Sequence, residues 1–447
     1  MYDLGIIGGG PAGYTAAERA AVNGLRVVIF EKADFGGVCL NEGCIPTKTI
    51  LYSAKLISNA RGASKYGVSA ENVSFDYGKI IARKNKVVRK MNAGVRARMN
   101  HENIKMVVGE ASVISTSDEG IGLQCSGEAF RVRNLLICTG SHNFFPPIPG
   151  IVPDTVWTSR EALTSKELPA SIAIIGGGVI GMEFAGFFNT LGVEVTVVEM
   201  LDEILGNMDK EISALLREEY TKKGIRFQLQ SKVLELRGNE LIFEKDGEKM
   251  SVNAERVLLS VGRKSNMDGA GLENLPIETF RGGVVVNEYM QTSVPHIYAA
   301  GDVTGFSLLA HTAVREAEVA VNHMLGISDA MSYAAIPGVV YTNPEVAGVG
   351  ETEESLITKK KPYHVAKLSM NFSGRFVAEN EGGNGLCKIL SDEKGKVLGV
   401  HLIGNPASEI ITVATLAMEL DLTVAQWQKS VFPHPTVGEI LKETLFE

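Results

Sequence analysis

Short apolar runs alternate with amphipathic stretches through the first part of the chain. An apolar run at residues 4–7 is followed by a helical pattern to about residue 23 and by a second apolar run at residues 25–30. The same order returns at residues 171–175, 179–191 and 193–198. Because strands that alternate with helices form parallel sheets, the chain is predicted to have an α/β fold with an internal repeat of one strand–helix–strand unit.

Later segments extend this pattern. They predict buried strands at residues 135–140, 256–262 and 297–302 and a helix at about residues 308–324. Residues 145–149, FPPIP, form a stiff proline-rich connector, and a polar stretch runs from residue 263 to residue 268. We expect a domain boundary at each of these two segments.

The final third has a different character. It predicts an antiparallel sheet followed by two helices, with strands at residues 365–368, 386–390 and 397–403 and helices at residues 408–420 and 437–445. The last two strands are joined by a polar turn, SDEKGK. This part is therefore predicted to be a separate α+β domain.

Each copy of the repeated unit has a glycine-rich turn between its first strand and its helix. The turns are Gly8–Gly13 and Gly176–Gly181, and an acid, Glu31 or Glu199, follows the first glycine by 23 residues in both copies. In such a turn the glycines permit a tight bend and close approach of a pyrophosphate to the helix start, and the acid binds ribose hydroxyls. One such turn is weak evidence, but two matched copies favour two dinucleotide sites over ordinary glycine-rich turns.

The second site is predicted to prefer NAD to NADP. The residues after Glu199 are Met200, Leu201, Asp202 and Glu203, and none of them is basic. A 2′-phosphate would be repelled by the acids and would find no arginine here.

Two of the five cysteines, Cys39 and Cys44, lie close together in GGVCLNEGCIPTK, residues 36–48. Pro46 and the apolar spacing of Ile50, Ala54 and Ile57 predict that a helix starts near Cys44. A helix start favours a thiolate, and Lys48 adds positive charge one turn later. The sequence thus indicates a site that stabilises one cysteine as an anion.

Three other interpretations of the cysteine pair compete with a redox role. A zinc site needs about four ligands, and no CxxC or histidine cluster lies nearby. A structural disulfide fits poorly with a cytosolic chain. Two inert cysteines would leave the glycine-rich flank without a purpose. We favour a redox-active pair that exchanges electrons with a flavin and a nicotinamide, and we interpret Cys125, Cys138 and Cys387 as core or surface residues.

Composition limits the function further. A length of 447 residues suggests about three domains, and a net charge of −8 argues against nucleic acid or an anionic membrane as the main partner. No apolar run approaches the roughly 18 residues that span a bilayer, and the start has no signal-peptide pattern. We therefore expect a cytoplasmic protein.

Five motifs, in order, resemble the pyridine nucleotide–disulfide oxidoreductase family: GGGPAG, GGVCLNEGCIPTK, GGGVIGMEFAG, YAAGDVTG and HPTVGE. The CLNEGCIPTK form is closest to the dihydrolipoamide dehydrogenase branch. The resemblance covers nearly the whole chain. It implies two Rossmann-like domains and a C-terminal α+β dimerisation domain, with FAD bound by residues 1–146 and 266–330, NAD by residues 147–265, and dimerisation through residues 331–447.

The resemblance also implies which residues contact the cofactors. For FAD they are Gly8, Gly10, Pro11, Ala12, Gly13, Glu31, Lys32, Gly37, Lys48, Ala111, Thr139, Gly140, Asp302 and Ala310. For NAD they are Gly176, Gly178, Val179, Ile180, Gly181, Glu199, Val233, Gly262 and Arg263. No metal site is expected.

The catalytic roles follow from the same resemblance. Cys44 would face the flavin as a charge-transfer thiolate, Cys39 would exchange with the substrate, and Lys48 would lie near flavin N5, paired with Glu183. A base that works near neutral pH is naturally a histidine. His434, oriented by Glu439, would act across the interface of a homodimer, although on its own a histidine between two prolines is typical of a surface turn. Two residues depart from the family pattern: Glu42 replaces a commonly apolar residue and Gly438 a common serine.

The implied activity is NAD-dependent oxidation of dihydrolipoamide, or of protein-bound dihydrolipoyl groups, through a Cys39–Cys44 disulfide and FAD. The expected partners are lipoyl domains or carrier proteins of a 2-oxoacid dehydrogenase, acetoin or glycine cleavage complex. The alternatives are an NADH-dependent reductase of another disulfide and, in a different class, a non-catalytic flavin scaffold. The sequence contains no degraded catalytic residue that would support the scaffold.

Overall fold

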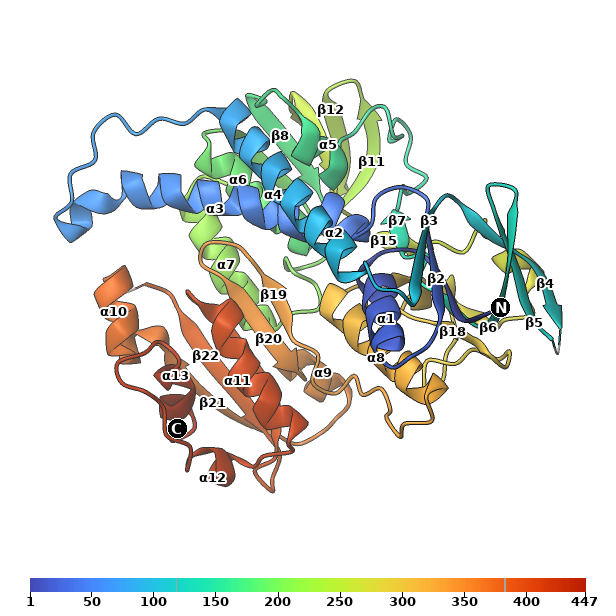
Figure 1. Ribbon diagram of the computed structural model, residues 1–447. Helices are drawn as coiled ribbons and strands as arrows, with labels where there is room; N and C mark the ends of the chain where they lie inside the picture. The colour runs from blue at the N-terminus through green and yellow to red at the C-terminus, as the bar shows by residue number, and fades with distance from the viewer. Residues whose placement is uncertain (118, 382) are drawn as a thin grey trace. The chain divides into compact units, whose positions relative to one another are not determined.

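The computed structural model describes residues 1–117, 119–381 and 383–447, and the chain divides into two compact units (Figure 1). Unit 1 consists of Met1–Thr49, Gly78–Phe144 and Gly262–Ser332. Unit 2 consists of Ile50–Tyr77, Phe145–Val261 and Tyr333–Glu447. Each unit is thus assembled from segments that lie far apart in the sequence.

Unit 1 is built on a seven-stranded sheet in the order β3-β2-β1-β6-β5-β4, with β18 paired to β6. Strands β1, β2, β3, β6 and β18 run parallel, whereas β4 and β5 form an antiparallel hairpin that continues into β6. Helices α1 and α8 lie side by side (Figure 1). The main elements are β1 (Tyr2–Ile7), α1 (Pro11–Val22), β2 (Val27–Glu31), α2 (Gly37–Asn41), α4 (Tyr77–Arg98), β3 (Ile104–Val108), β4 (Ala111–Ser117), β5 (Gly120–Cys125), β6 (Glu128–Ile137), β18 (Ile297–Ala299) and α8 (Ala310–Met324).

The first strand–helix–strand unit and the helix near residues 308–324 are confirmed by β1, α1, β2 and α8. Three strand predictions need new bounds. The strand predicted at residues 256–262 is β14 of unit 2, which ends at Leu259. β6 ends at Ile137 but begins at Glu128, because its first half pairs with β5 and its second half with β18. β18 ends at Ala299, since Gly301 has a left-handed φ of +81° and a short 3-10 turn begins at Asp302.

Unit 2 contains the second copy of the repeat. Its parallel sheet has the order β10-β9-β8-β14, and an antiparallel three-stranded sheet, β11-β12-β13, is inserted in the chain between β10 and β14. The predicted strand at residues 171–175 and the helix and strand after it are confirmed. The elements are α5 (Ser159–Thr164), β8 (Ser171–Ile175), α6 (Val179–Thr190), β9 (Glu194–Val198), α7 (Lys210–Lys222), β10 (Arg226–Gln228), β11 (Ser231–Arg237), β12 (Glu240–Lys245), β13 (Glu248–Asn253) and β14 (Arg256–Leu259).

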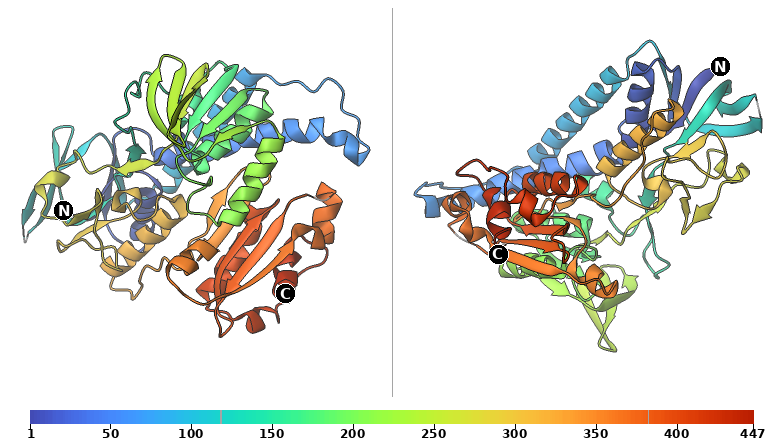
Figure 2. Two further views of the ribbon diagram at one scale, coloured as in Figure 1. Left: turned by 180° about the vertical axis from the view of Figure 1, so that it is seen from behind. Right: turned by 90° about the horizontal axis from the view of Figure 1, so that it is seen from below.

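The end of unit 2 is an antiparallel sheet in the order β19-β20-β23-β22-β21, packed against α11. Figure 2 shows this sheet from behind, with α7 running up to it. All three predicted strands and both predicted helices are present, so the predicted α+β character is confirmed. The elements are β19 (Gly338–Val340), β20 (Val346–Gly350), α9 (Glu353–Thr358), β21 (His364–Ser369), α10 (Gly374–Asn380), β22 (Leu386–Ser391), β23 (Val397–Ile403), α11 (Ala407–Glu419), α12 (Val424–Trp427) and α13 (Glu439–Thr444).

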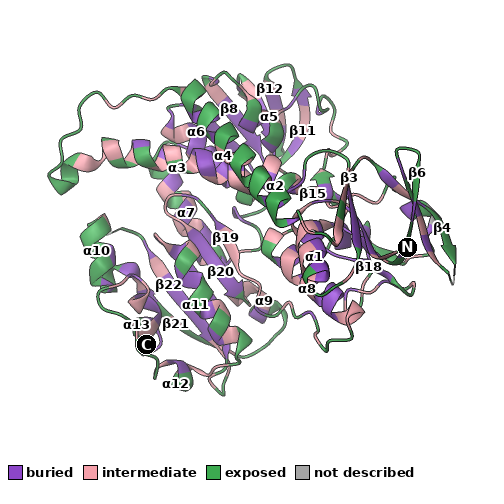
Figure 3. Ribbon diagram, in the orientation of Figure 1, coloured by how far each residue is buried: buried purple, intermediate pink, exposed green. Residues whose placement is uncertain are grey.

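Strands β1, β8 and β23, which lie inside their sheets, are largely buried (Figure 3). In unit 2 the apolar core of the C-terminal sheet includes Val400, Leu402 and Ile440, each fully buried. Among the described residues, no helix combines the length and the apolar character needed to cross a membrane.

Helix α7 is fixed to the C-terminal sheet by a buried ion cluster. The Lys388 ammonium, on β22, lies 3.0 Å from Asp209, which caps α7, and 2.8 and 2.5 Å from carboxylate oxygens of Glu211 and Glu353. These three acids raise the pKa of Lys388 against the opposing effect of burial. The lysine therefore stays charged inside the unit.

Replacing Lys388 with methionine is expected to lower the free energy of unfolding by about 3–5 kcal/mol, because the buried acids lose their counter-charge. Lys367→Met is the matched control, since Lys367 pairs with Glu211 at 2.9 Å but is half exposed. The control should cost less than about 1 kcal/mol. Urea unfolding of both variants makes the comparison, and equal losses would contradict the structural role of Lys388.

Candidate dinucleotide and dithiol sites

The first glycine turn joins β1 to α1. Gly8 has φ +110°, and a Cβ there would lie 2.1 Å from the carbonyl oxygen of Cys138. Pro11 occupies the first turn of α1, and Ala12 is buried beside it. A Cβ on Gly13 would lie 1.9 Å from the Gly8 oxygen, so the helix can pack this closely only with glycine at position 13.

The second glycine turn repeats this geometry between β8 and α6. Gly176 has φ +97°, and a Cβ on Gly181 would lie 2.1 Å from the Gly176 oxygen. A Cβ on Gly178, directly before α6, would meet nothing within 4 Å. The start of α6, with Val179 and Ile180 in its first turn, therefore faces open space of the kind that a pyrophosphate needs.

The two acids are held in the same way. Glu31 accepts hydrogen bonds from the backbone N–H of Gly9 (2.7 Å) and of Ala33 (2.8 Å). Glu199 accepts them from Gly177 (2.6 Å) and Leu201 (2.8 Å). Each carboxylate thus sits against its glycine turn, and its oxygens keep lone pairs that can accept from ribose hydroxyls.

Basic side chains near the second acid are already neutralised. Lys210 lies 2.5 Å from Asp202, and Arg217 donates to both oxygens of Glu203 at 2.9 and 3.0 Å. Neither cation is available for a 2′-phosphate. This arrangement supports the predicted preference for NAD.

Other residues with a predicted FAD contact gather in unit 1. Ser141 donates to Asp302 at 2.5 Å, and Arg263 donates to Ser141 and lies 4.0 Å from Asp302. Thr139 and Gly140 are tied to Asn266 by three hydrogen bonds. Gly37 approaches Gly10 so closely that a Cβ on Gly37 would lie 2.7 Å from the Gly10 Cα. Ala310 is the first residue of α8, and Ala111 is the buried first residue of β4. Lys32 pairs with Glu110 at the surface.

Not every predicted NAD contact lies in the same unit. Val233 is buried on β11 of unit 2, with the Gly176–Gly181 turn. Gly262 and Arg263 belong to unit 1, where Gly262 has φ +116° and open space at its Cβ position. Burial lowers the pKa of Arg263, while Asp302 and Glu42 oppose that shift.

The cysteine pair spans the turn between two helices. Cys39 lies in α2, the chain reverses at Glu42 and Gly43, and α3 (Cys44–Arg61) begins at Cys44, as predicted. The two cysteines therefore lie in different helices, since the short helix α2 precedes α3. The two thiols are hydrogen-bonded to each other, and this bond, with burial, raises the pKa of Cys39, while Lys48 acts in the opposite direction.

The other three cysteines are buried and do not share this environment. Burial raises the pKa of Cys138, and it raises that of Cys387 to about 12. A buried thiol is out of reach of a substrate in solution. Cys39 and Cys44, both partly exposed, are the reactive candidates.

His434 and Glu439 form a pair at the end of unit 2. The imidazole Nδ1 lies 3.0 Å from Glu439, whose other oxygen accepts from the Thr436 N–H at 2.7 Å. The hydrogen bond from the Thr436 N–H, and to a smaller extent the one to His434, holds the pKa of Glu439 below its usual value. Since a carboxylate only accepts, Nδ1 carries the proton and Nε2 is left as a base on a side chain that is 80% exposed. The bond to Pro435 is cis.

Lys48 and Glu183 lie in different units. Lys48 follows Cys44 by one turn of α3, in unit 1. Glu183 is buried in α6 of unit 2 and accepts a hydrogen bond from the Tyr341 N–H at 3.0 Å.

Sequence reasoning missed several residues that shape these sites. Ser141 is hydrogen-bonded to Asp302 and Arg263, and Asn266 is hydrogen-bonded to Thr139. Ser141 and Asn266 come from two short stretches that lie more than a hundred residues apart in the sequence. Tyr14 of α1 lies near the thiols: burial raises its pKa, and charge on Cys39 adds to the effect. No local pattern marks these contacts.

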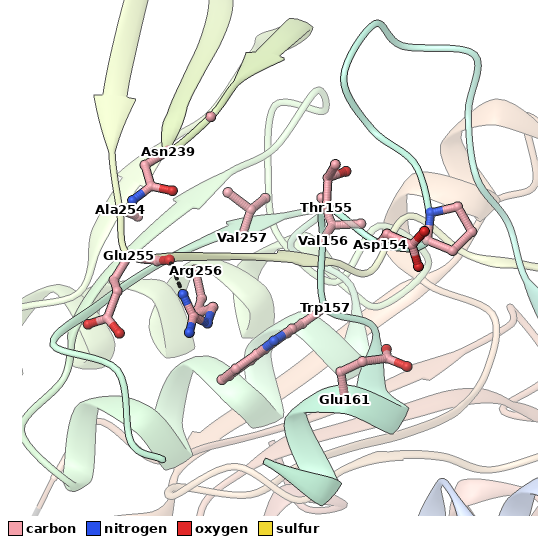
Figure 4. A pocket seen from close by; sticks show the side chains of 12 residues that line it. Asp154, Thr155, Val156, Trp157, Glu161, Asn239, Ala254, Glu255, Arg256 and Val257 are labelled. Carbon is pink, nitrogen blue, oxygen red and sulfur yellow. Dashed lines mark hydrogen bonds between the residues drawn. The ribbon is translucent and has the colours of Figure 1, made fainter. Parts of the chain in front are cut away.

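A cavity of about 520 Å³ lies in unit 2, away from the glycine turn (Figure 4). It opens at the start of β14, whereas nucleotides bind at the carboxyl ends of parallel strands. The Arg256 guanidinium lies 5.5 Å from the centre of the Trp157 ring on its wall. None of the predicted NAD contacts lines this cavity. The described part of the chain also shows no cluster of three acidic, cysteine or histidine side chains suited to a metal.

Two glycine turns with matched acids, together with a hydrogen-bonded thiol pair, define a redox protein that uses two dinucleotides. Residues 2–320 match the family model for pyridine nucleotide-disulphide oxidoreductases, and residues 336–445 match that family's dimerisation domain. The chain belongs to the pyridine nucleotide-disulphide oxidoreductase family. The dimerisation domain supports a homodimer.

Similar proteins cover the whole chain. It is 37% identical to a dihydrolipoyl dehydrogenase of Mycoplasma pneumoniae, over 100% of this chain and 99% of that one, and 38% identical to one of Bacillus subtilis, over 99% and 97%. Among solved structures it resembles LpdA from Mycobacterium tuberculosis (TM-score 0.90, 25% identity, 99% of both chains). It also resembles the HOCl-induced flavoprotein disulfide reductase RclA from Escherichia coli (TM-score 0.86, 27% identity, 100% and 99%).

Replacing Gly13 with alanine is expected to cost about 1–3 kcal/mol of stability and to deplete bound FAD, because the new Cβ meets the Gly8 backbone. Gly94→Ala is the control, since a Cβ there meets nothing within 4 Å on helix α4. That variant should gain about 0.5–1 kcal/mol. Flavin absorbance of the purified proteins and thermal unfolding test both, and full FAD content in Gly13→Ala would contradict this role of the turn.

Proposed function

We propose that the chain is a dihydrolipoyl dehydrogenase that oxidises dihydrolipoyl groups with NAD. The observation that carries the proposal is the pair of partly exposed thiols, Cys39 in α2 and Cys44 at the start of α3. The second nucleotide acid, Glu199, is followed by Asp202 and Glu203, which pair with Lys210 and Arg217. The full-length similarity to several dihydrolipoyl dehydrogenases supports it.

In this proposal FAD is bound by the Gly8–Gly13 turn, Glu31 and Asp302, and NAD by the Gly176–Gly181 turn and Glu199. The other residues for which a contact was predicted complete these two sites. The residues of this turn fit FAD, since its glycines let the backbone approach closely and Glu31 is already oriented by the Gly9 N–H. When bound, FAD supplies two-electron transfer between the dithiol and the nicotinamide.

The chain's own residues perform the thiol chemistry. A substrate thiolate attacks the Cys39 sulfur of the oxidised pair, the Cys39–Cys44 bond breaks, and Cys44 leaves as a thiolate that the α3 start and Lys48 stabilise. The second substrate thiol then attacks the mixed disulfide at the substrate sulfur and releases oxidised lipoamide and the Cys39 thiol. His434 Nε2 accepts the substrate proton, and Glu439 fixes the imidazole tautomer.

We further propose that His434 and Glu439 act on the cysteines of the partner subunit. The dimerisation domain, residues 336–445, contains both residues, which supports this arrangement. The proposed domains are residues 1–146 with 266–330 for FAD, 147–265 for NAD and 331–447 for dimerisation. We propose a cytoplasmic location, which the low cysteine content supports.

The test mixes purified, FAD-loaded protein with dihydrolipoamide and NAD without oxygen and follows NADH absorbance. Rapid NADH formation, and much slower formation of NADPH from NADP, is the expected result.

Similarity to a flavoprotein disulfide reductase raises a second candidate, an NADH-dependent reductase of another disulfide. No NADH from dihydrolipoamide, together with NADH consumption on another disulfide, would favour that candidate.

Glu199→Gln is expected to lower the ratio of kcat/KM for NAD to that for NADP by about tenfold, which corresponds to about 1.4 kcal/mol. The neutral amide binds the ribose hydroxyls less strongly and no longer repels a 2′-phosphate. Glu194→Gln, at the exposed start of β9, the strand that Glu199 follows, is the control and should leave the ratio unchanged. Steady-state rates with both nucleotides measure the effect, and an unaltered ratio in Glu199→Gln would refute the nucleotide role of this acid.

A further inference from the structure

Helix α4, Tyr77–Arg98, concentrates positive charge in an acidic protein. Its 22 residues include eight lysines and arginines and no acid, whereas the whole chain has a net charge of −8. The eight are Lys79, Arg83, Lys84, Lys86, Arg89, Lys90, Arg96 and Arg98. An ordinary solvated helix would balance such charges with acids three or four residues away.

Most of these cations gather on one exposed face. Lys79, Arg83, Lys86 and Lys90 follow the spacing i, i+4, i+7, i+11, which places them in one row along the helix, with Arg89 beside it. The opposite side buries Ile80, Ile81 and Val95. We call Lys79, Arg83, Lys86, Arg89 and Lys90 the α4 basic face; all five are exposed, and Figure 3 shows the outer side of α4 largely open to solvent.

The centre of this face has no internal counter-charge. Near the helix end, Arg96 lies 3.9 Å from Asp34, and Arg98 pairs with Glu18. In contrast, Lys86, Arg89 and Lys90 have no ion-pair or hydrogen-bond partner within the described ranges of the chain. Three neighbouring cations repel one another and gain most from an acidic partner.

The same helix supports the cysteine segment. Asn92 of α4 donates to the Asn41 side chain at 2.7 Å, at the end of the short helix that contains Cys39. Arg83 donates to the Thr49 carbonyl at 2.9 Å, in the helix that begins with Cys44. Whatever binds the α4 basic face is therefore held next to the elements that carry the reactive thiols, within unit 1.

We propose that the α4 basic face is the docking surface for an acidic protein that carries the dihydrolipoyl substrate. This inference rests on the proposed function and names the surface through which a substrate attached to a protein reaches Cys39. A tethered dithiol reaches the thiols only when its carrier sits close by, which the position of α4 provides. Charge complementarity then raises the association rate of an acidic carrier without a large apolar interface.

Other anionic partners fit the surface less well. A membrane-binding helix needs large apolar side chains beside its cations, and Met91, 42% exposed, is the one exposed large apolar side chain of α4 in the part of the chain the structure describes. Nucleic acid would be repelled by the rest of the chain, whose net charge is −16 because α4 contributes +8 to the total of −8.

The experiment uses the FAD-loaded full chain with Lys86→Glu, Arg89→Glu and Lys90→Glu combined. The substrates are free dihydrolipoamide and an acidic lipoyl domain that carries a reduced lipoyl-lysine. The matched control is Lys166→Glu, Lys249→Glu and Lys394→Glu, three exposed lysines outside α4 that give the same change in net charge. At low ionic strength the α4 variant should lose about tenfold in kcat/KM with the lipoyl domain, and the loss should vanish near 0.5 M salt, where screening acts over about 4 Å.

Each outcome separates the docking proposal from the proposed function. With free dihydrolipoamide, all three proteins should be equally active, whereas inactivity of the unmodified protein would refute the proposed function itself. Equal kcat/KM of the α4 variant and the control with the lipoyl domain would overturn the docking surface alone. A second result would also overturn it: the α4 variant loses binding to phosphatidylserine vesicles or to DNA but keeps full turnover of the lipoyl domain. The α4 basic face would then serve another partner.

Discussion

Replacing Cys44 with serine is expected to lower NADH formation from dihydrolipoamide by at least about a thousandfold while FAD stays bound. Serine cannot form the disulfide that the substrate thiol attacks, and it cannot leave as a stabilised thiolate. The position is specific, because Cys44 begins α3 and is hydrogen-bonded to Cys39. Steady-state NADH formation, with flavin content measured on the same sample, gives the result.

Cys125→Ser is the matched control for this variant. Cys125 is a free, buried cysteine of β5 in the same unit, so its replacement tests the general effect of losing a sulfur atom. We expect less than a twofold change in its turnover. Comparable activity of Cys44→Ser and Cys125→Ser would show that the reaction does not use the dithiol.

His434→Gln is expected to lower kcat with dihydrolipoamide by about 10²–10⁴-fold, the range typical for loss of a general base. Glutamine has similar size and polarity but cannot accept the substrate proton. Glu439→Gln should have an effect no larger than that of His434→Gln, because the imidazole remains while the acid that orients Nδ1 is neutralised. Steady-state kcat values of both variants make the comparison.

His364→Gln provides the control for the histidine change, since His364 is exposed at the start of β21 in the same unit. A double variant of His434 and Glu439 should be no slower than His434→Gln alone, because the acid acts through the imidazole. Additive losses would contradict this coupling, and an unaffected rate in His434→Gln would exclude it as the base.

The local patterns of this chain were readable from the sequence because each depends on neighbours. The two glycine turns, their acids and the helix start at Cys44 are set by φ angles, helix starts and apolar spacing within about 25 residues. Helix α4 shows where such reasoning is weaker. Its apolar residues, such as Ile80, Ile81, Val87 and Val88, occur as adjacent pairs among short basic runs, so its periodicity is faint although the helix is 22 residues long.

Contacts between distant segments were not readable from the sequence. Ser141 supports Asp302 and Arg263, and Lys388 holds Asp209 across a separation of 179 residues. A single sequence contains no periodic signal for such pairs. The β4–β5 hairpin was missed for a related reason: it pairs with the outer half of β6, and only the buried inner half of that strand, Leu135–Ile137, has a clear apolar run.

The most direct test of the account asks which thiols the substrate reduces. Oxidised, FAD-loaded protein is treated with one equivalent of dihydrolipoamide without NAD or oxygen. It is then alkylated rapidly under denaturing conditions with a labelled reagent, and the labelled cysteines are mapped by mass spectrometry. Untreated protein is alkylated and mapped in the same way for comparison. The account predicts that Cys39 and Cys44 are blocked before treatment and become labelled together, while labelling of Cys125, Cys138 and Cys387 does not change. Labelling of Cys39 and Cys44 that is the same before and after treatment would contradict a redox disulfide at this site.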